Sequence, residues 1–175
     1  MNAALGTRMI KNWSSLKELF GTDDGSLPDI EIDNLSGDEV INGYDFIRNH
    51  AERISSKEPS YWSTSKDCDV PFKYEDNPAY QVVSGEAESF HLCFVGLKCP
   101  SGKKIPELGL FVFSDCLSFD YRMGAQWDEQ AVKGLFELIL CLSKDFKNMK
   151  ICHKNNIKDD DGSIFQSHWV AYKNA

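Results

Sequence analysis

The chain has 175 residues, a formal net charge of −8 and a hydrophobic fraction of 42%. This length and apolar content predict one folded domain with a hydrophobic core and argue against an intrinsically disordered protein. The acidic balance disfavours nucleic acid as a direct partner, because phosphate binding needs a basic surface. With no long apolar run and no signal-peptide pattern, we expect a cytoplasmic protein whose cysteines stay reduced.

Residues 1–56 are expected to form a helical and acidic N-terminal segment. Apolar residues recur at spacings of three and four over 8–20, which predicts a first helix. Alternation over 27–35 favours an edge strand or an extended arm. A capping-box spacing, followed by the apolar period of a helix, predicts the next helix over 39–55.

The middle of the chain is expected to begin with a long connection. Prolines interrupt an aromatic stretch over 60–85, which indicates a connection packed on the core with a short strand at 80–83. Residues 90–97 and 108–113 are apolar on both faces, as expected for interior strands covered on both sides. The alternating stretch 117–122 is expected to pair with the strand before it as a hairpin.

The C-terminal part contains the clearest helical pattern of the sequence. An apolar stripe over 128–146 predicts a long amphipathic helix. A strand is predicted at 149–153, a polar loop at 155–162 and a final strand at 164–172.

These elements predict an α+β fold in a single domain spanning 1–175. We expect a mainly antiparallel sheet of about four to six strands, formed largely by residues 80–175. Two long helices, 39–55 and 128–146, are expected to pack on this sheet.

The sequence lacks the common signatures of enzymes and metal sites. It contains no phosphate loop, dinucleotide glycine fingerprint, nucleophile elbow or His-Glu-x-x-His motif. His91, Cys93 and Cys99 do not have the paired spacing of a structural zinc site. Residues 159–162 resemble a calcium loop, but aligning them places no acid at its first and twelfth positions. We therefore expect a protein without enzymatic activity, metal or cofactor.

Two cysteines next to aspartates, Cys68 and Cys116, are poor candidates for a nucleophile. A neighbouring carboxylate raises the pKa of a thiol and so disfavours the reactive thiolate.

A polar corner, Asp120-Tyr121-Arg122, ends the second strand of the predicted hairpin. Pairing of Asp120 and Arg122 with each other or with loop backbone explains this corner structurally, and it is also a secondary candidate for partner binding. The alternative functional hypothesis is a small-molecule-binding domain or enzyme whose pocket lies at this corner and near Trp62, Tyr74 and His91.

Negative charge is concentrated in one stretch of the sequence. Between Gly21 and Ile47 there are eight acids and no Lys or Arg: Asp23, Asp24, Asp29, Glu31, Asp33, Asp38, Glu39 and Asp45. A helix dipole explains acids at the start of the helix 39–55, and the others could be a solvated face. The functional interpretation is a surface that docks a basic protein partner. The region after the long helix is locally basic, with Lys147, Lys150, Lys154 and Lys158.

Two stretches carry a family resemblance. One runs from Phe119-Asp-Tyr-Arg-Met-Gly124 through Trp127 to Phe136-Glu-Leu-Ile139, and the other is His50-Ala-Glu-Arg-Ile54 followed by Pro59-Ser-Tyr-Trp62. They resemble immunity proteins of bacterial polymorphic, or contact-dependent, toxin systems. The resemblance implies a non-catalytic protein that binds a cognate toxin domain, often a nuclease, and covers or distorts its active site. It identifies no toxin-contacting residue.

Overall fold

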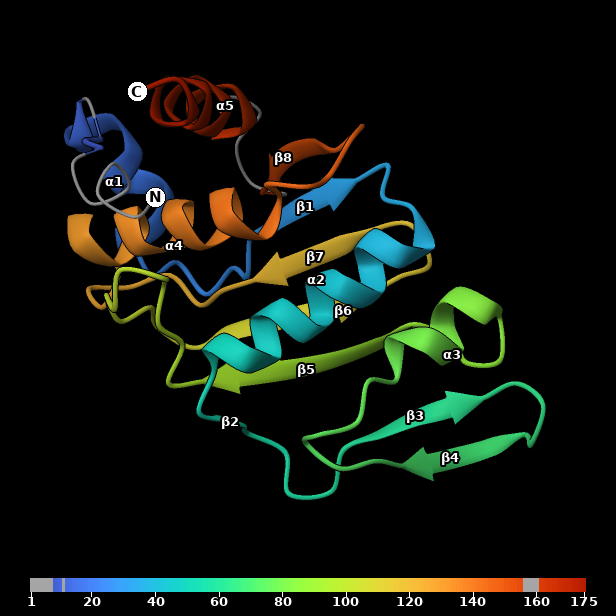
Figure 1. Ribbon diagram of the computed structural model, residues 1–175. Helices are drawn as coiled ribbons and strands as arrows, with labels where there is room; N and C mark the ends of the chain where they lie inside the picture. Colours follow the sequence, from blue (N-terminus) through green and yellow to red (C-terminus); the bar gives the residue numbers. More distant parts are fainter. Residues whose placement is uncertain (1–7, 11, 156–160) are drawn as a thin grey trace.

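The computed structural model describes residues 8–10, 12–155 and 161–175, which form an α+β fold (Figure 1). Its main sheet has six strands in the order β2-β5-β6-β7-β1-β8, and every neighbouring pair is antiparallel. These strands are β1 (Asp29–Asp33), β2 (Arg53–Ile54), β5 (Phe90–Val95), β6 (Leu108–Val112), β7 (Leu117–Asp120) and β8 (Lys150–Lys154). A separate hairpin consists of β3 (Ser60–Ser63) and β4 (Cys68–Pro71).

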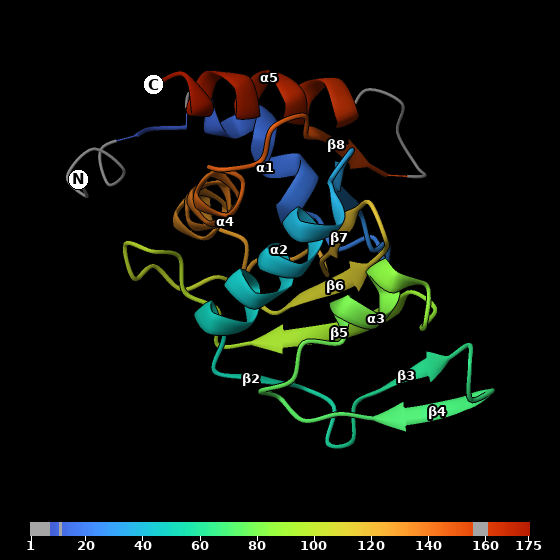
Figure 2. The ribbon, with the colours of Figure 1, turned by 45° about the vertical axis from the view of Figure 1, so that its right-hand side comes forward.

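Five helices accompany the sheet in the described residues: α1 (Trp13–Gly21), α2 (Gly37–His50), α3 (Ala79–Ser84), α4 (Glu129–Leu142) and α5 (Asp161–Lys173). Helices α2 and α4 cross one face of the sheet, and α5 lies against β8 (Figures 1 and 2). None of these helices combines the length and apolar content needed to span a membrane.

The helices gather on one side of the sheet. The core-facing His153 of β8 stacks on Phe165 of α5 and lies against Phe20 of α1. On α2, Gly43 lies so close to the side chain of Leu117 in β7 that a methyl group there would overlap it. The buried side chains of β1, β6 and β7 therefore meet a single helical layer.

Several predicted elements are present with shifted ends. The hairpin of β6 and β7 and the strands β5 and β8 lie within or beside the predicted ranges. The capping box is confirmed, because the Ser36 hydroxyl accepts the Glu39 N–H and the Glu39 carboxylate accepts the Ser36 N–H. The prediction of two long helices holds only in part. Helices α2 and α4 have 14 residues each and end before residues 55 and 146, and the first helix begins at Trp13.

Two predicted strands are helices. Residues 80–83 lie in α3, where the Asn77 side chain accepts the Ala79 N–H and Gly85, at φ 79°, ends the helix. Residues 164–172 lie in α5, whose buried aromatic residues recur at a helical spacing: Phe165, Trp169 and Tyr172. Short apolar runs do not distinguish a strand from a buried helix by pattern alone. Most of the polar loop predicted at 155–162, and with it Lys158, lies outside the described residues.

Two predictions about the sheet are wrong. The stretch predicted as an edge strand or arm contains β1, which is interior and pairs with β7 on one side and β8 on the other. The strands predicted to be covered on both faces are covered on one, since His91 is exposed and Phe111 is 37% exposed. An alternating pattern shows that one face of a strand meets solvent, but it does not show whether the strand has one neighbour or two.

One buried charge links α4 to the turn between β5 and β6. The Glu137 side chain is fully buried and accepts hydrogen bonds from the Ser101 N–H at 2.6 Å and the Ser101 hydroxyl at 2.7 Å. The Lys103 ammonium lies 3.2 Å from the same carboxylate. Burial alone would raise the pKa of Glu137, but these hydrogen bonds outweigh it and hold the pKa below its usual value.

Candidate functional site on the open face of the sheet

One face of the six-stranded sheet carries no helix in the described part of the chain, and we call it the open face. Side chains alternate between the two faces of a strand, so every second residue points to it. Its polar and charged side chains are Arg53, His91, Cys93, Ser118, Asp120, Asp29, Glu31, Asp33, Lys150, Cys152 and Lys154.

The strand register places acids of two strands next to each other. Asp29 of β1 pairs directly with Asp120 of β7, and such partners have Cβ atoms about 4.5–5.5 Å apart. Burial raises the pKa of Asp29, and the charges of Asp120 and Glu31 raise it further. Burial is the first of these causes, and the register places the carboxylates of Asp29, Glu31 and Asp120 close together near the centre of the open face.

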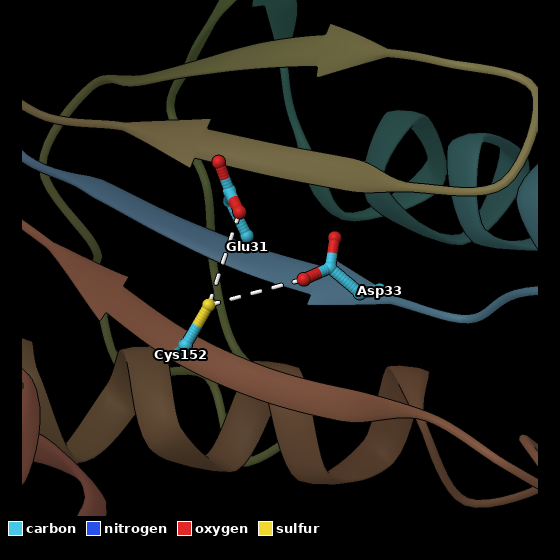
Figure 3. Close-up of side chains that lie close together, drawn as sticks. All are labelled: Glu31, Asp33 and Cys152. Carbon is cyan, nitrogen blue, oxygen red and sulfur yellow. Dashed lines mark hydrogen bonds between the residues drawn. The ribbon is translucent and has the colours of Figure 1, made fainter.

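Three side chains meet between β1 and β8 (Figure 3). The Cys152 thiol donates to the carboxylates of Glu31, at 3.8 Å, and Asp33, at 3.9 Å. Burial, followed by these two carboxylates, raises the pKa of Cys152. Immediately before β7, burial and a hydrogen bond to Asp33 raise the pKa of the Cys116 thiol as well. Both thiols are therefore held protonated and act as hydrogen-bond donors to the acids.

The same cluster has the donor atoms of a cation site. One ligand atom from each of Glu31, Asp33 and Cys152 lies within 4.8 Å of the other two. Two carboxylates and a thiolate could bind a divalent metal once the thiol loses its proton. The Lys154 ammonium already contacts Glu31, however, and it places a positive charge where a cation would bind. In this structure the Cys152 thiol donates to Glu31 and Asp33, and the Lys154 ammonium pairs with Glu31.

A cavity of about 490 Å³ occupies the other end of the open face. Inside it the His91 imidazole donates from Nε2 to the Asp120 carboxylate at 2.7 Å, across strand β6. Gly109 lies directly beneath this pair, and a Cβ atom there would overlap both side chains. Arg122 lines the cavity too, so the structure brings together part of the predicted pocket.

The other members of that predicted pocket lie elsewhere. Trp62 is in β3, 39% exposed, and is not part of the cavity. The Tyr74 hydroxyl donates to backbone carbonyls at the C-terminal end of α2. Tyr121 is buried, and its hydroxyl donates to the Leu19 carbonyl and accepts from His153 Nε2, both at 2.8 Å. Tyr121 therefore supports the core beneath the cavity.

The corner residues on either side of Tyr121 do not pair with each other in the described structure. Asp120 binds His91, and the exposed Arg122 guanidinium lies 3.7 Å from Asp23.

The acidic stretch between 21 and 47 is divided between different surfaces. Its β1 members, Asp29, Glu31 and Asp33, lie on the open face, and Asp23 and Asp24 precede them in a turn where Asp24 accepts the Ser26 N–H. The remaining three belong to α2, in the helical layer: Asp38, Glu39 and Asp45. Hydrogen bonding to Ser36 lowers the pKa of Glu39, and Asp45 pairs with Arg48 at 2.6 Å.

The open face also includes residues that the sequence did not identify as partners of the acids. Asp120 joins the acids of β1 only through the register, and Gly109 and Cys152 gain their roles from neighbouring strands. The alternation of each strand could have placed them on one face, but strand order and register are not readable from one sequence.

No protein-family model and no curated protein matches the sequence. The fold is similar to a chain in the crystal structure of the toxic C-terminal tip of CdiA from Pseudomonas aeruginosa in complex with immune protein. The two chains share 13% identity, with a TM-score of 0.48, over 75% of this chain and 86% of the other. A likeness of this extent assigns no residue role, so the role of the open face is argued from its own side chains.

Proposed function

We propose that this chain is a non-catalytic binding protein whose open face receives a basic surface of a cognate toxin domain and covers its active site. The observation that carries the proposal is the concentration of Asp29, Glu31, Asp33 and Asp120 on a sheet face without a helix. That the partner is a toxin domain is inferred from the family resemblance of the sequence.

Charge complementarity supports a basic partner. Of the four acids, Glu31 contacts Lys154 and Asp120 binds His91. The register also places Lys154 opposite Asp29 and Lys150 opposite Asp33. Burial and then the carboxylates of Asp120 and Glu31 raise the pKa of Asp29, and Lys154 offsets this only in part, so a further cation brought by a partner would relieve the remaining repulsion. Such a surface steers a basic protein toward it and increases the association rate, most strongly at low salt.

The chemistry of the cavity favours binding over catalysis. Cys93 lies two residues after His91 on the open face. Burial, and then the charges of Asp120 and Glu107, raise the pKa of its thiol, which opposes formation of a nucleophilic thiolate. The hydrogen bond between His91 and Asp120 orients the imidazole, and an oriented imidazole can also bind a ligand.

The decisive experiment reverses the charge of β1. The partner is first recovered from the source cell and identified by growth rescue on co-expression. The variant Asp29→Lys/Glu31→Lys/Asp33→Lys should then associate about ten-fold or more slowly at low salt, with the difference shrinking as salt is added. A matched control makes the same charge change at exposed acids outside the open face: Glu58→Lys, Glu75→Lys and Glu86→Lys. Equal association rates for the two triple variants would refute the proposal.

A second candidate function is supported by the cavity itself. Asp120 and Glu107 line it beside His91, an arrangement suited to a small molecule that carries hydrogen-bond donors. Turnover or saturable binding of such a molecule by the purified protein, unaffected by the β1 reversal, would favour this function.

A further inference from the structure

A second large cavity lies in the helical layer, on the opposite side of the sheet from the open face. It has a volume of about 640 Å³ and lies where the C-terminal ends of α4 and α5 approach the turn around Pro100. This volume is within the range of about 300–1,000 Å³ that ligand pockets occupy. Four basic side chains line it, and no acid does among the described residues: Arg8, Lys144, Lys147 and Lys173.

The charge of this cavity is opposite to that of the protein. The chain has 27 acids and 19 Lys and Arg residues, yet none of these four side chains forms a salt bridge within the described ranges. The Arg8 guanidinium donates to the last carbonyls of α5, Tyr172 and Lys173, and so closes that helix. Lys147 has an acidic neighbour in Glu39, which accepts its backbone N–H. The ammonium groups of Lys144 and Lys173 have no such partner among the described contacts.

The same cavity has an apolar wall. Leu140, Phe146 and Met149 are partly buried, pack against the core and contribute to its lining. Several cationic groups gathered at one concave, apolar wall attract an anion more strongly than isolated surface lysines do. The apolar wall in turn favours a ligand with hydrocarbon or aromatic surface to bury.

We propose that this cavity binds a small organic anion: a carboxylate or phosphate attached to an aliphatic or aromatic body. The anionic group lies against the ammonium groups of Lys144 and Lys173, and the apolar body lies against Phe146 and Met149. This site is separate from the open face, and its occupation does not depend on a protein partner.

Three ligands separate the contributions of charge and apolar surface. Titration calorimetry compares decanoate, which has both features, with decanol, which lacks the charge, and acetate, which lacks the chain. Decanoate is expected to bind at least about ten-fold more tightly than either of the others. Equal affinity for decanoate and decanol, or no decanoate binding below its micellar concentration, overturns the proposal. Binding to anionic vesicles but not to monomeric decanoate also overturns it, because the surface would then be a membrane contact.

Cysteine labelling of the unmodified protein locates the ligand. Cys141 lines the cavity, whereas Cys68 is exposed in β4, outside it. Saturating decanoate should slow the reaction of N-ethylmaleimide with Cys141 several-fold and leave Cys68 unchanged, as followed by peptide mass spectrometry. Equal slowing at both cysteines, or at neither, places the ligand elsewhere.

Charge removal provides the second test. Lys144→Gln/Lys173→Gln should weaken decanoate binding about ten-fold with little change in thermal stability, since both side chains are exposed. The control, Lys104→Gln/Lys150→Gln, removes the same charge from exposed lysines that do not line this cavity. Equal loss in both pairs would show a nonspecific effect of net charge and would refute the site.

Discussion

Replacing Gly109 with alanine tests the geometry at the centre of the open face. A methyl group at this position would overlap both Asp120 and His91, which meet above the glycine at 2.7 Å. Relieving such an overlap costs about 1–3 kcal/mol, and alanine returns about 0.4–1 kcal/mol by restricting the unfolded chain. The net of these two ranges is about 0–2.6 kcal/mol, and we expect Gly109→Ala to lower the free energy of unfolding by about 1.3 kcal/mol, the middle of that range, in urea at pH 7.

The cause is isolated by repeating the change after both long side chains are removed. In a His91→Ala/Asp120→Ala background the added methyl group has space, so Gly109→Ala should cost at least about 0.5 kcal/mol less. Gly102 serves as the control, because its φ of +84° strains any replacement while no atom lies within 4 Å of its added Cβ. Gly102→Ala should cost the same in both backgrounds. An unchanged cost of Gly109→Ala in the truncated background would refute the role assigned to this glycine.

Three further changes probe buried and charged groups. Glu137→Gln should lower the free energy of unfolding by about 1–3 kcal/mol at pH 7, because it removes the charge from a buried hydrogen-bonded carboxylate. The folded pKa of Glu137 is lowered, so its stabilisation is present above the unfolded value near 4.5 and is lost as pH falls through the folded value. The variant should consequently show a smaller loss between pH 6 and pH 3 in urea titrations, and an unchanged loss would contradict this. Asp29→Asn should instead increase the free energy of unfolding at pH 7. The folded pKa of Asp29 is raised above the unfolded value of 3.8, so the native protein loses stability as pH rises from the unfolded pKa through the folded pKa. An amide does not ionise, so Asp29→Asn should raise the melting temperature at pH 7. Tyr121→Phe leaves the buried His153 without its hydroxyl partner and should cost about 1–3 kcal/mol in urea, with native circular dichroism retained. A cost below about 0.5 kcal/mol would show that the hydroxyl is dispensable.

The local elements that could be predicted from the sequence are those with a strong and unambiguous period. In the hairpin, β6 is continuously apolar and β7 alternates. The start of α2 carries a capping box, which local hydrogen bonds alone determine. Helix α5 is not predicted even though its buried residues Phe165, Trp169 and Tyr172 recur at the helical spacings of four and three, because β-branched and aromatic residues also favour a strand. Tertiary packing against β8 and α4 settles its conformation.

The candidate site could be predicted only in part. The charge pattern of the sequence identifies the acids of β1. It does not show that they lie on a different surface from the acids of α2, because that depends on which side of the sheet α2 covers. The pairing of His91 with Asp120 requires β6 to lie between β5 and β7 and to carry a glycine at the crossing point. Both facts are properties of strand order and register, which long-range pairing sets.

The open face is costly to the free protein, and this cost argues for an external partner. Asp29 and Asp120 are placed directly opposite each other, a pairing of like charges that destabilises a sheet and that Lys154, opposite Asp29 on β8, offsets only in part. An amide at either position would fit the same space. Local violations of this kind concentrate at functional sites. A basic partner placed on the face would convert the repulsion into attraction between the two molecules. Stability and binding should therefore change in opposite directions when these acids are neutralised.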